Sequence, residues 1–144
     1  MSTELHDLTA RLAITSLLAR IAHLADDGEV AEYLACFTAD ASWELKNGRG
    51  LDLAPQVRRG YDELAAGVHE RRASGMQGPG SHTMHDISSI DIRVDGDTAR
   101  ATSYFRYYRS TDATPELVTM GRYDDEFTKT VDGWRMRRRV IRRD

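Results

Sequence analysis

The chain has 144 residues, of which 40% are hydrophobic and 30% charged, and its formal net charge is −3. This length fits one core, so we expect residues 1–144 to form a single domain. The one cysteine excludes an internal disulfide and a thiolate zinc site. No apolar run approaches the roughly 20 residues of a membrane helix, and the N-terminus is unlike a signal peptide. We therefore expect a cytoplasmic protein that binds neither a membrane nor, given its acidic balance, nucleic acid.

Helical spacing of apolar residues predicts three helices in the first half of the chain. The first spans residues 8–24, with Asp7 available as its N-cap, and turn residues at 26–28 end it. A shorter second helix is expected over residues 30–37, followed by a turn and strand at 38–45 and a tight reversal at 47–50. The third helix is expected from about Tyr61 to Arg72, before a loop rich in Gly, Ser and Pro at 74–81.

After that loop the apolar residues recur with a period of two, which is typical of half-buried strands. Strands are expected over residues 83–94, 99–108, 117–127 and 134–141, with turns at Asp95-Gly96-Asp97 and Val131-Asp132-Gly133. Helices followed by an antiparallel meander indicate an α+β fold, with the helices on one face of a curved sheet.

In the first of these strands, the apolar residues switch from odd-numbered to even-numbered positions. Ile90, Ile92 and Val94 share one parity, whereas His85 and Ile87 share the other. A one-residue bulge at 88–89 would bring all five side chains to the core face, and bulges are common beside active sites. His85 would then point inward as a candidate general base, although a core histidine satisfied by a backbone carbonyl explains the pattern equally well.

Asp26 is the candidate partner of His85. It lies at the C-terminal end of the first helix, where the helix dipole disfavours a negative charge. One interpretation is a solvent-facing turn residue before Gly28. The other is a carboxylate that fixes the tautomer of a nearby histidine, as proton abstraction from carbon requires. His82 is a weaker candidate, and because no carboxylate or thiolate set accompanies the two histidines we expect no metal.

The last strand is rich in arginine, which is most often a solvated face. One arginine could reach the mouth of a pocket and stabilise an anionic leaving group, and Arg139 is the candidate. Aromatic side chains in the strands suit the walls of a pocket for a flat apolar substrate. The candidate substrate-binding residues are Trp43, Phe105, Tyr107, Thr119 and Tyr123.

Six segments, taken together and in order, resemble the SnoaL-like branch of the nuclear-transport-factor-2-like superfamily, which includes polyketide cyclases, hexachlorocyclohexane dehydrochlorinase and scytalone dehydratase. The resemblance implies a cone-shaped α+β barrel, in which N-terminal helices wrap a curved, mostly antiparallel mixed sheet around a deep pocket, and a homodimer or homotrimer. The segments are residues 24–28, 33–43, 83–85, 94–99, 123–127 and 132–135.

The resemblance also implies catalytic positions. The family's aspartate, seventeen residues before the strand tryptophan Trp43, falls on Asp26, with Asp27 as the alternative. Its histidine, ten residues before Asp95, falls on His85. Its arginine, five residues after Trp134, falls on Arg139, with Arg138 as the alternative.

One position departs from the family. A helix tyrosine found in some related dehydratases is replaced by Ile21, so Tyr107 or Tyr123 would have to supply any phenol.

These observations predict a cofactor-independent lyase or isomerase, of the elimination, dehydration or cyclisation type. Asp26 and His85 would act on a small apolar cyclic or aromatic substrate by general acid/base catalysis. The alternative is a non-catalytic ligand-binding or structural subunit, such as the small subunit of ring-hydroxylating dioxygenases. Nucleic-acid binding through the arginine-rich tail is a third possibility, and it would depend steeply on salt.

Overall fold

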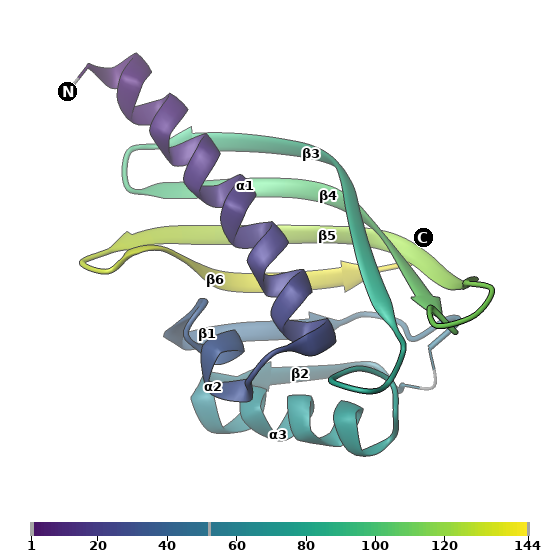
Figure 1. Ribbon diagram of the computed structural model, residues 1–144. Coiled ribbons are helices and arrows are strands. Elements are labelled where there is room, and N and C mark those ends of the chain that lie inside the picture. Colours follow the sequence, from purple (N-terminus) through teal and green to yellow (C-terminus); the bar gives the residue numbers. More distant parts are fainter. Residues whose placement is uncertain (1, 52, 144) are drawn as a thin grey trace.

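A computed structural model describes residues 2–51 and 53–143. Within these residues three helices and six strands follow one another along the chain (Figure 1). The elements are α1 (Thr3–Asp27), α2 (Val30–Leu34), β1 (Phe37–Leu45), β2 (Gln56–Arg59), α3 (Gly60–Ala73), β3 (Met84–Asp95), β4 (Thr98–Arg109), β5 (Glu116–Thr130) and β6 (Gly133–Arg142).

The strands form one sheet in the order β2-β1-β6-β5-β4-β3. Strands β3 to β6 pair antiparallel as a meander, and β1 pairs with β6 in parallel, which makes the sheet mixed. Figure 1 shows α1 crossing one face of the sheet and α3 lying beside the β1–β2 end. The predicted α+β class and the wrapped, curved mixed sheet are confirmed, with β2 and β3 left as open edges rather than joined into a closed barrel.

Helix α1 begins earlier than its pattern predicts. Ser2 is the N-cap, because its Oγ accepts a hydrogen bond from the Leu5 amide at 3.1 Å, so the prediction that Asp7 caps the helix is wrong. By length and composition α1 would suffice to cross a membrane, with a mean hydropathy of 1.3. Its inner face instead packs in the core: the buried residues are Ala10, Ile14, Leu17, Leu18, Ile21, Ala22 and Ala25.

The predicted bulge in β3 is confirmed. Ser88 pairs with Tyr104 and Asp91 pairs with Thr102. Between these two pairs β3 therefore contains one residue more than β4. Ser89 has a φ of 52°, in the left-handed region. The bulge brings every inward-predicted side chain of β3 to the helix-covered side, where His85, Ile87, Ile90, Ile92 and Val94 are all buried or half-buried.

Two features between β1 and α3 differ from the sequence prediction. Phe37 begins β1 rather than ending the second helix, which stops at Leu34. The strand β2 was not predicted, because its four residues are short and polar, with no core-facing run to signal a strand. β2 pairs antiparallel with β1 and leads through Gly60, which has a φ of +78°, into α3.

The bulge generates a stability prediction. We expect Ser89→Gly to raise the free energy of unfolding by about 0.5–1 kcal/mol, since relief of left-handed strain outweighs the chain entropy that glycine adds. Ser88→Gly, a change of the same chemistry at a residue without positive φ, should instead lower it. Urea unfolding followed by circular dichroism measures both, and a lower midpoint for Ser89→Gly would contradict this account of the bulge.

Candidate active site

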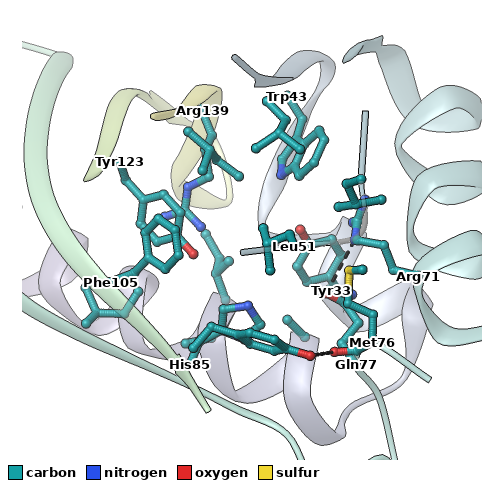
Figure 2. Close-up of a pocket in the computed structure, with 18 residues that line it drawn as sticks. Tyr33, Trp43, Leu51, Arg71, Met76, Gln77, His85, Phe105, Tyr123 and Arg139 are labelled. Carbon is teal, nitrogen blue, oxygen red and sulfur yellow. Dashed lines mark hydrogen bonds between the residues drawn. The ribbon is translucent and has the colours of Figure 1, made fainter. Parts of the chain in front are cut away.

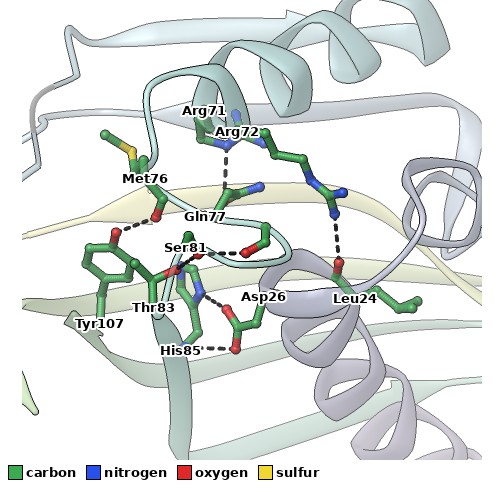
Figure 3. Close-up of polar contacts among 11 residues, drawn as sticks. Leu24, Asp26, Arg71, Arg72, Met76, Gln77, Ser81, Thr83, His85 and Tyr107 are labelled. Carbon is green, nitrogen blue, oxygen red and sulfur yellow. Dashed lines mark hydrogen bonds and ion pairs between the residues drawn. The ribbon is translucent and has the colours of Figure 1, made fainter. Parts of the chain in front are cut away.

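Asp26 and His85 meet at the end of α1. The imidazole Nδ1 of His85 and the Asp26 Oδ1 are 2.7 Å apart, and Asp26 Oδ2 accepts a hydrogen bond from the His85 backbone amide at 3.1 Å (Figure 3). Only 13% of the Asp26 side chain and 18% of the His85 side chain are exposed. Asp27, the alternative, is exposed to solvent. The carboxylate therefore holds both the ring and the backbone of His85.

Arg72 offsets the unfavourable placement of Asp26 at a helix C-terminus. Its Nη2 donates to the Leu24 carbonyl at 3.1 Å and to the Gly28 carbonyl at 2.7 Å, so a cation caps the last turn of α1 (Figure 3). Gly78 allows this approach. Its φ is +101°, and a Cβ there would lie 2.9 Å from the Arg72 Cγ. The capping cation and the two donors from His85 together stabilise the Asp26 charge.

A narrow cavity lies against the ring of His85 (Figure 2). The space that the centre of a water molecule can reach is about 60 Å³, against the several hundred Å³ common for ligand pockets. Its walls come from the three helices, from every strand except β2 and from two loops. The aromatic lining residues are Tyr33, Trp43, Phe105, Tyr107 and Tyr123.

Four of the five predicted substrate-binding residues line the cavity, and Thr119 does not. The Thr119 hydroxyl donates to the Arg49 carbonyl at 3.0 Å, which ties the loop after β1 to β5. Thr119 is 3% exposed, so its side chain points inward, and the loop that covers it lies 70 residues away in sequence. Its role in binding a substrate stays a prediction.

The two tyrosines that could supply a phenol are both constrained. The Tyr107 hydroxyl donates to the Met76 carbonyl, and burial raises the pKa of this phenol. Tyr123 stacks on Phe105 with ring centroids 4.6 Å apart, and burial raises the pKa of Tyr123 well above its usual range. Both phenols therefore remain protonated and serve as wall and donor groups.

Arg139 lies in the buried wall of the cavity rather than at its mouth, where the sequence placed it. Its Nε and Nη2 donate to the two Asp125 oxygens at 2.9 and 3.0 Å, and its guanidinium lies 3.6 Å from the centroid of the Tyr123 ring. Desolvation alone would lower the pKa of Arg139, but the Asp125 carboxylate outweighs it and raises the pKa. Arg138, the alternative, is half-exposed and pairs with Glu126 at 3.2 Å.

Two polar residues of the cavity were missed by the sequence analysis. Arg71 and Gln77 are each 7% exposed, and both line the cavity. A signal for Arg71 was available, because it follows Leu64 and Val68 at helical spacing on the inner face of α3. Gln77 lies in a loop, where no periodicity indicates direction.

No site for a metal is evident in the described part of the chain, which holds no group of three or more His, Cys, Asp or Glu side chains able to bind one ion. The only cysteine, Cys36, is buried, and burial raises the pKa of its thiol. The polar side-chain groups that line the cavity are the imidazole of His85, three tyrosine phenols, the indole N–H of Trp43, two guanidiniums and one amide.

The Asp26 anchor predicts a difference between neighbouring aspartates. We expect Asp26→Ala to lower the free energy of unfolding by about 1–3 kcal/mol, because two N–H groups of His85 lose their acceptor. Asp27→Ala should change it by no more than about 0.5 kcal/mol, as a surface substitution. Guanidinium unfolding of both variants measures the contrast, and equal midpoints would show that the carboxylate does not anchor β3.

The buried ion pair predicts a non-additive pair of substitutions. Asp125→Leu alone should cost about 3–5 kcal/mol of unfolding free energy, since it leaves the Arg139 charge buried and unpaired. Adding Arg139→Met should recover most of that loss. Arg138→Met, at the neighbouring half-exposed pair, should cost less than about 1 kcal/mol. Additive losses in this double-mutant cycle would contradict the pairing.

Comparison with known proteins identifies the family of the domain. Residues 6–140 match the model of the SnoaL-like domain. An uncharacterised protein of Mycobacterium tuberculosis is 27% identical over 137 residues, which cover 93% of this chain and 85% of that protein.

Solved structures share the fold. An NTF2-like protein with a cystatin-like fold from Novosphingobium aromaticivorans superposes with a TM-score of 0.79 at 24% identity, covering 96% of this chain and 84% of that one. From the same organism, the β subunit of a candidate aromatic-ring-hydroxylating dioxygenase gives 0.75 at 21%, covering 96% and 91%. A candidate scytalone dehydratase gives 0.71 at 21%, covering 96% and 86%. With a family match over nearly its whole length, the chain belongs to the SnoaL-like domain family.

Proposed function

We propose that this protein is a cofactor-independent lyase or isomerase that abstracts a proton from carbon with His85. The observation that carries the proposal is the Asp26–His85 contact at 2.7 Å beside an apolar cavity. The carboxylate accepts from Nδ1–H and so leaves Nε2 as the basic nitrogen, which has no hydrogen-bond partner among residues 2–51 and 53–143. Asp26 is a positioning residue, and His85 is the catalytic residue.

The proposed proton transfer needs no cofactor. Nε2 of His85 takes a proton from a substrate carbon, and the C–H electron pair becomes the new C=C bond. The leaving group departs with its own bonding pair in an elimination, and the double bond shifts in an isomerisation. Asp26 stabilises the imidazolium, which then returns its proton to the leaving group, to another substrate carbon or to water.

The lining supports a small, ring-containing substrate. The stacked pair of Phe105 and Tyr123 offers a flat apolar wall, and His85 lies with its ring centroid 5.0 Å from that of Tyr107. Because the cavity is narrow, substrate entry in this proposal displaces the loop-borne side chains Leu51, Leu53 and Met76. General base catalysis supplies about 10²–10⁴-fold, and positioning within the cavity has to supply the rest.

A second candidate function is a non-catalytic binding or structural role. The observation that favours it is the small cavity of about 60 Å³, which several side chains nearly fill. The likeness to a dioxygenase β subunit is one of fold. In this role His85 would be a structural histidine held by Asp26, and replacing it would affect stability without affecting any proton transfer.

Proton exchange separates the two candidates. We expect the wild-type protein to exchange an acidic C–H of a small cyclic ketone, such as 2-tetralone, with deuterium from D₂O, followed by NMR. His85→Ala should slow this exchange by about 10²–10⁴-fold. Asp26→Asn should slow it by at least about tenfold, because the ring loses its fixed tautomer.

His82→Ala is the matched control, since the His82 side chain is 55% exposed and outside the cavity. Its exchange rate should equal that of the wild type. Loss of exchange in His82→Ala together with His85→Ala would indicate a general effect on folding. Unchanged exchange in a folded His85→Ala protein would refute the assignment of His85 as the base.

A further inference from the structure

Arg71 is a buried cation without a carboxylate partner. The residue is 7% exposed and lines the cavity from the last turn of α3. Its Nε donates to the Gln77 Oε1 at 3.3 Å, and its guanidinium lies over the Trp43 ring, 4.6 Å from the centroid. No acidic side chain in the described parts of the chain lies within salt-bridge distance of it. Burial lowers the pKa of Arg71, and the nearby charge of Arg58 acts in the same direction.

Gln77 adds a second unused donor at the same place. Its Oε1 accepts from Arg71, whereas its Nε2 is buried and has no hydrogen-bond partner within the described chain. A buried amide N–H without a partner is unfavourable, so such groups usually have one. Guanidinium and amide N–H groups are donors only, and both side chains line the cavity.

The contrast with Arg139 shows that this arrangement is specific to one side of the cavity. Arg139 is equally buried, but Asp125 neutralises it through two hydrogen bonds. Figure 2 shows Arg71 and Gln77 on one side of the cavity and Arg139 with Tyr123 on another. The molecule therefore keeps one buried positive charge compensated and leaves the other for a ligand to compensate.

We propose that Arg71 and Gln77 form a carboxylate subsite, so that the ligand of this cavity is a small aromatic or cyclic carboxylic acid in its anionic form. The carboxylate would accept hydrogen bonds from the guanidinium and from the Gln77 amide, satisfying both unused donors at once. The ring would lie against the apolar lining, with Trp43, which stacks on Arg71, at the junction between the two parts.

Only the catalytic use of this subsite rests on the proposed function; the binding of a carboxylate there does not. If His85 is the base, a carboxylate held by Arg71 fixes which substrate carbon faces Nε2, and charge recognition supplies binding energy that a cavity of about 60 Å³ cannot obtain from apolar contact alone. If His85 is not a base, the subsite still selects anionic ligands for a binding role.

A direct test compares benzoate with benzamide, which has the same shape and no charge, by NMR titration of the ¹⁵N-labelled full chain. We expect wild-type protein to bind benzoate at least about tenfold more tightly than benzamide. Arg71→Met should abolish that preference, Arg71→Lys should restore part of it, and Gln77→Leu should weaken benzoate about tenfold. Thermal unfolding of each variant confirms that it folds.

Two controls separate this inference from others. Arg93→Gln removes a side chain that is 85% exposed and should leave benzoate affinity unchanged, which excludes a general effect of net charge. His85→Ala should keep the preference for benzoate even where it abolishes proton exchange. In the wild-type protein, a preference for benzoate with no proton exchange would refute the proposed base and retain the subsite. Equal affinity for the two compounds, no binding of benzoate, or a preference that survives Arg71→Met in a folded protein would overturn the subsite.

Discussion

The two hydrogen bonds that the Asp26 carboxylate accepts from His85 connect the end of α1 to the start of β3, across 59 residues of sequence. Much of the candidate site depends on this link. It ties the last turn of α1 to the sheet, and it orients the imidazole that borders the cavity. A carboxylate at the negative end of a helix is unfavourable, and the cost is offset locally by Arg72, which caps the same turn from the end of α3. The link therefore joins three elements, and the cavity lies between them.

Three charged side chains around the cavity differ in how their charge is compensated. The Asp26 charge is held by N–H donors of His85, and the Arg139 charge is paired with Asp125. Arg71 has a ring face and one amide oxygen only. Because electrostatic interactions are strong in a desolvated site, an uncompensated charge there influences ligand choice more than a compensated one does. This asymmetry distinguishes Arg71 from the arginine that family resemblance singled out.

The parts of the site that sequence could predict are those in which one strand or helix determines direction. Alternation and the parity change at Ser88-Ser89 placed His85 on the inner face, and the helical pattern placed Asp26 at the end of the first helix. The family resemblance implied that the two residues act together. The parts it could not predict depend on partners from another element. Asp125 neutralises Arg139, a loop carbonyl takes the Thr119 hydroxyl, and the orientation of Gln77 follows from its contact with Arg71. A terminal arginine of a helix is usually solvated, so Arg71 was overlooked although its spacing matched the buried face.

Similarity to solved structures at 21–24% identity establishes the fold alone, and this fold is shared by a candidate dehydratase and a dioxygenase subunit. Function must therefore be argued from the cavity, whose narrowness at first favours a structural role. The wall that limits it, however, includes the loop between α3 and β3, which carries Met76 and Gln77 and is held to β4 by the Tyr107 hydroxyl at the Met76 carbonyl. A loop is the part of a wall that a ligand can displace at least cost, because it is not held by the hydrogen bonds of a helix or strand. A rigid structural subunit has no use for a buried guanidinium without a carboxylate partner and a buried amide N–H without an acceptor in the described chain, whereas the proposed carboxylate subsite uses both.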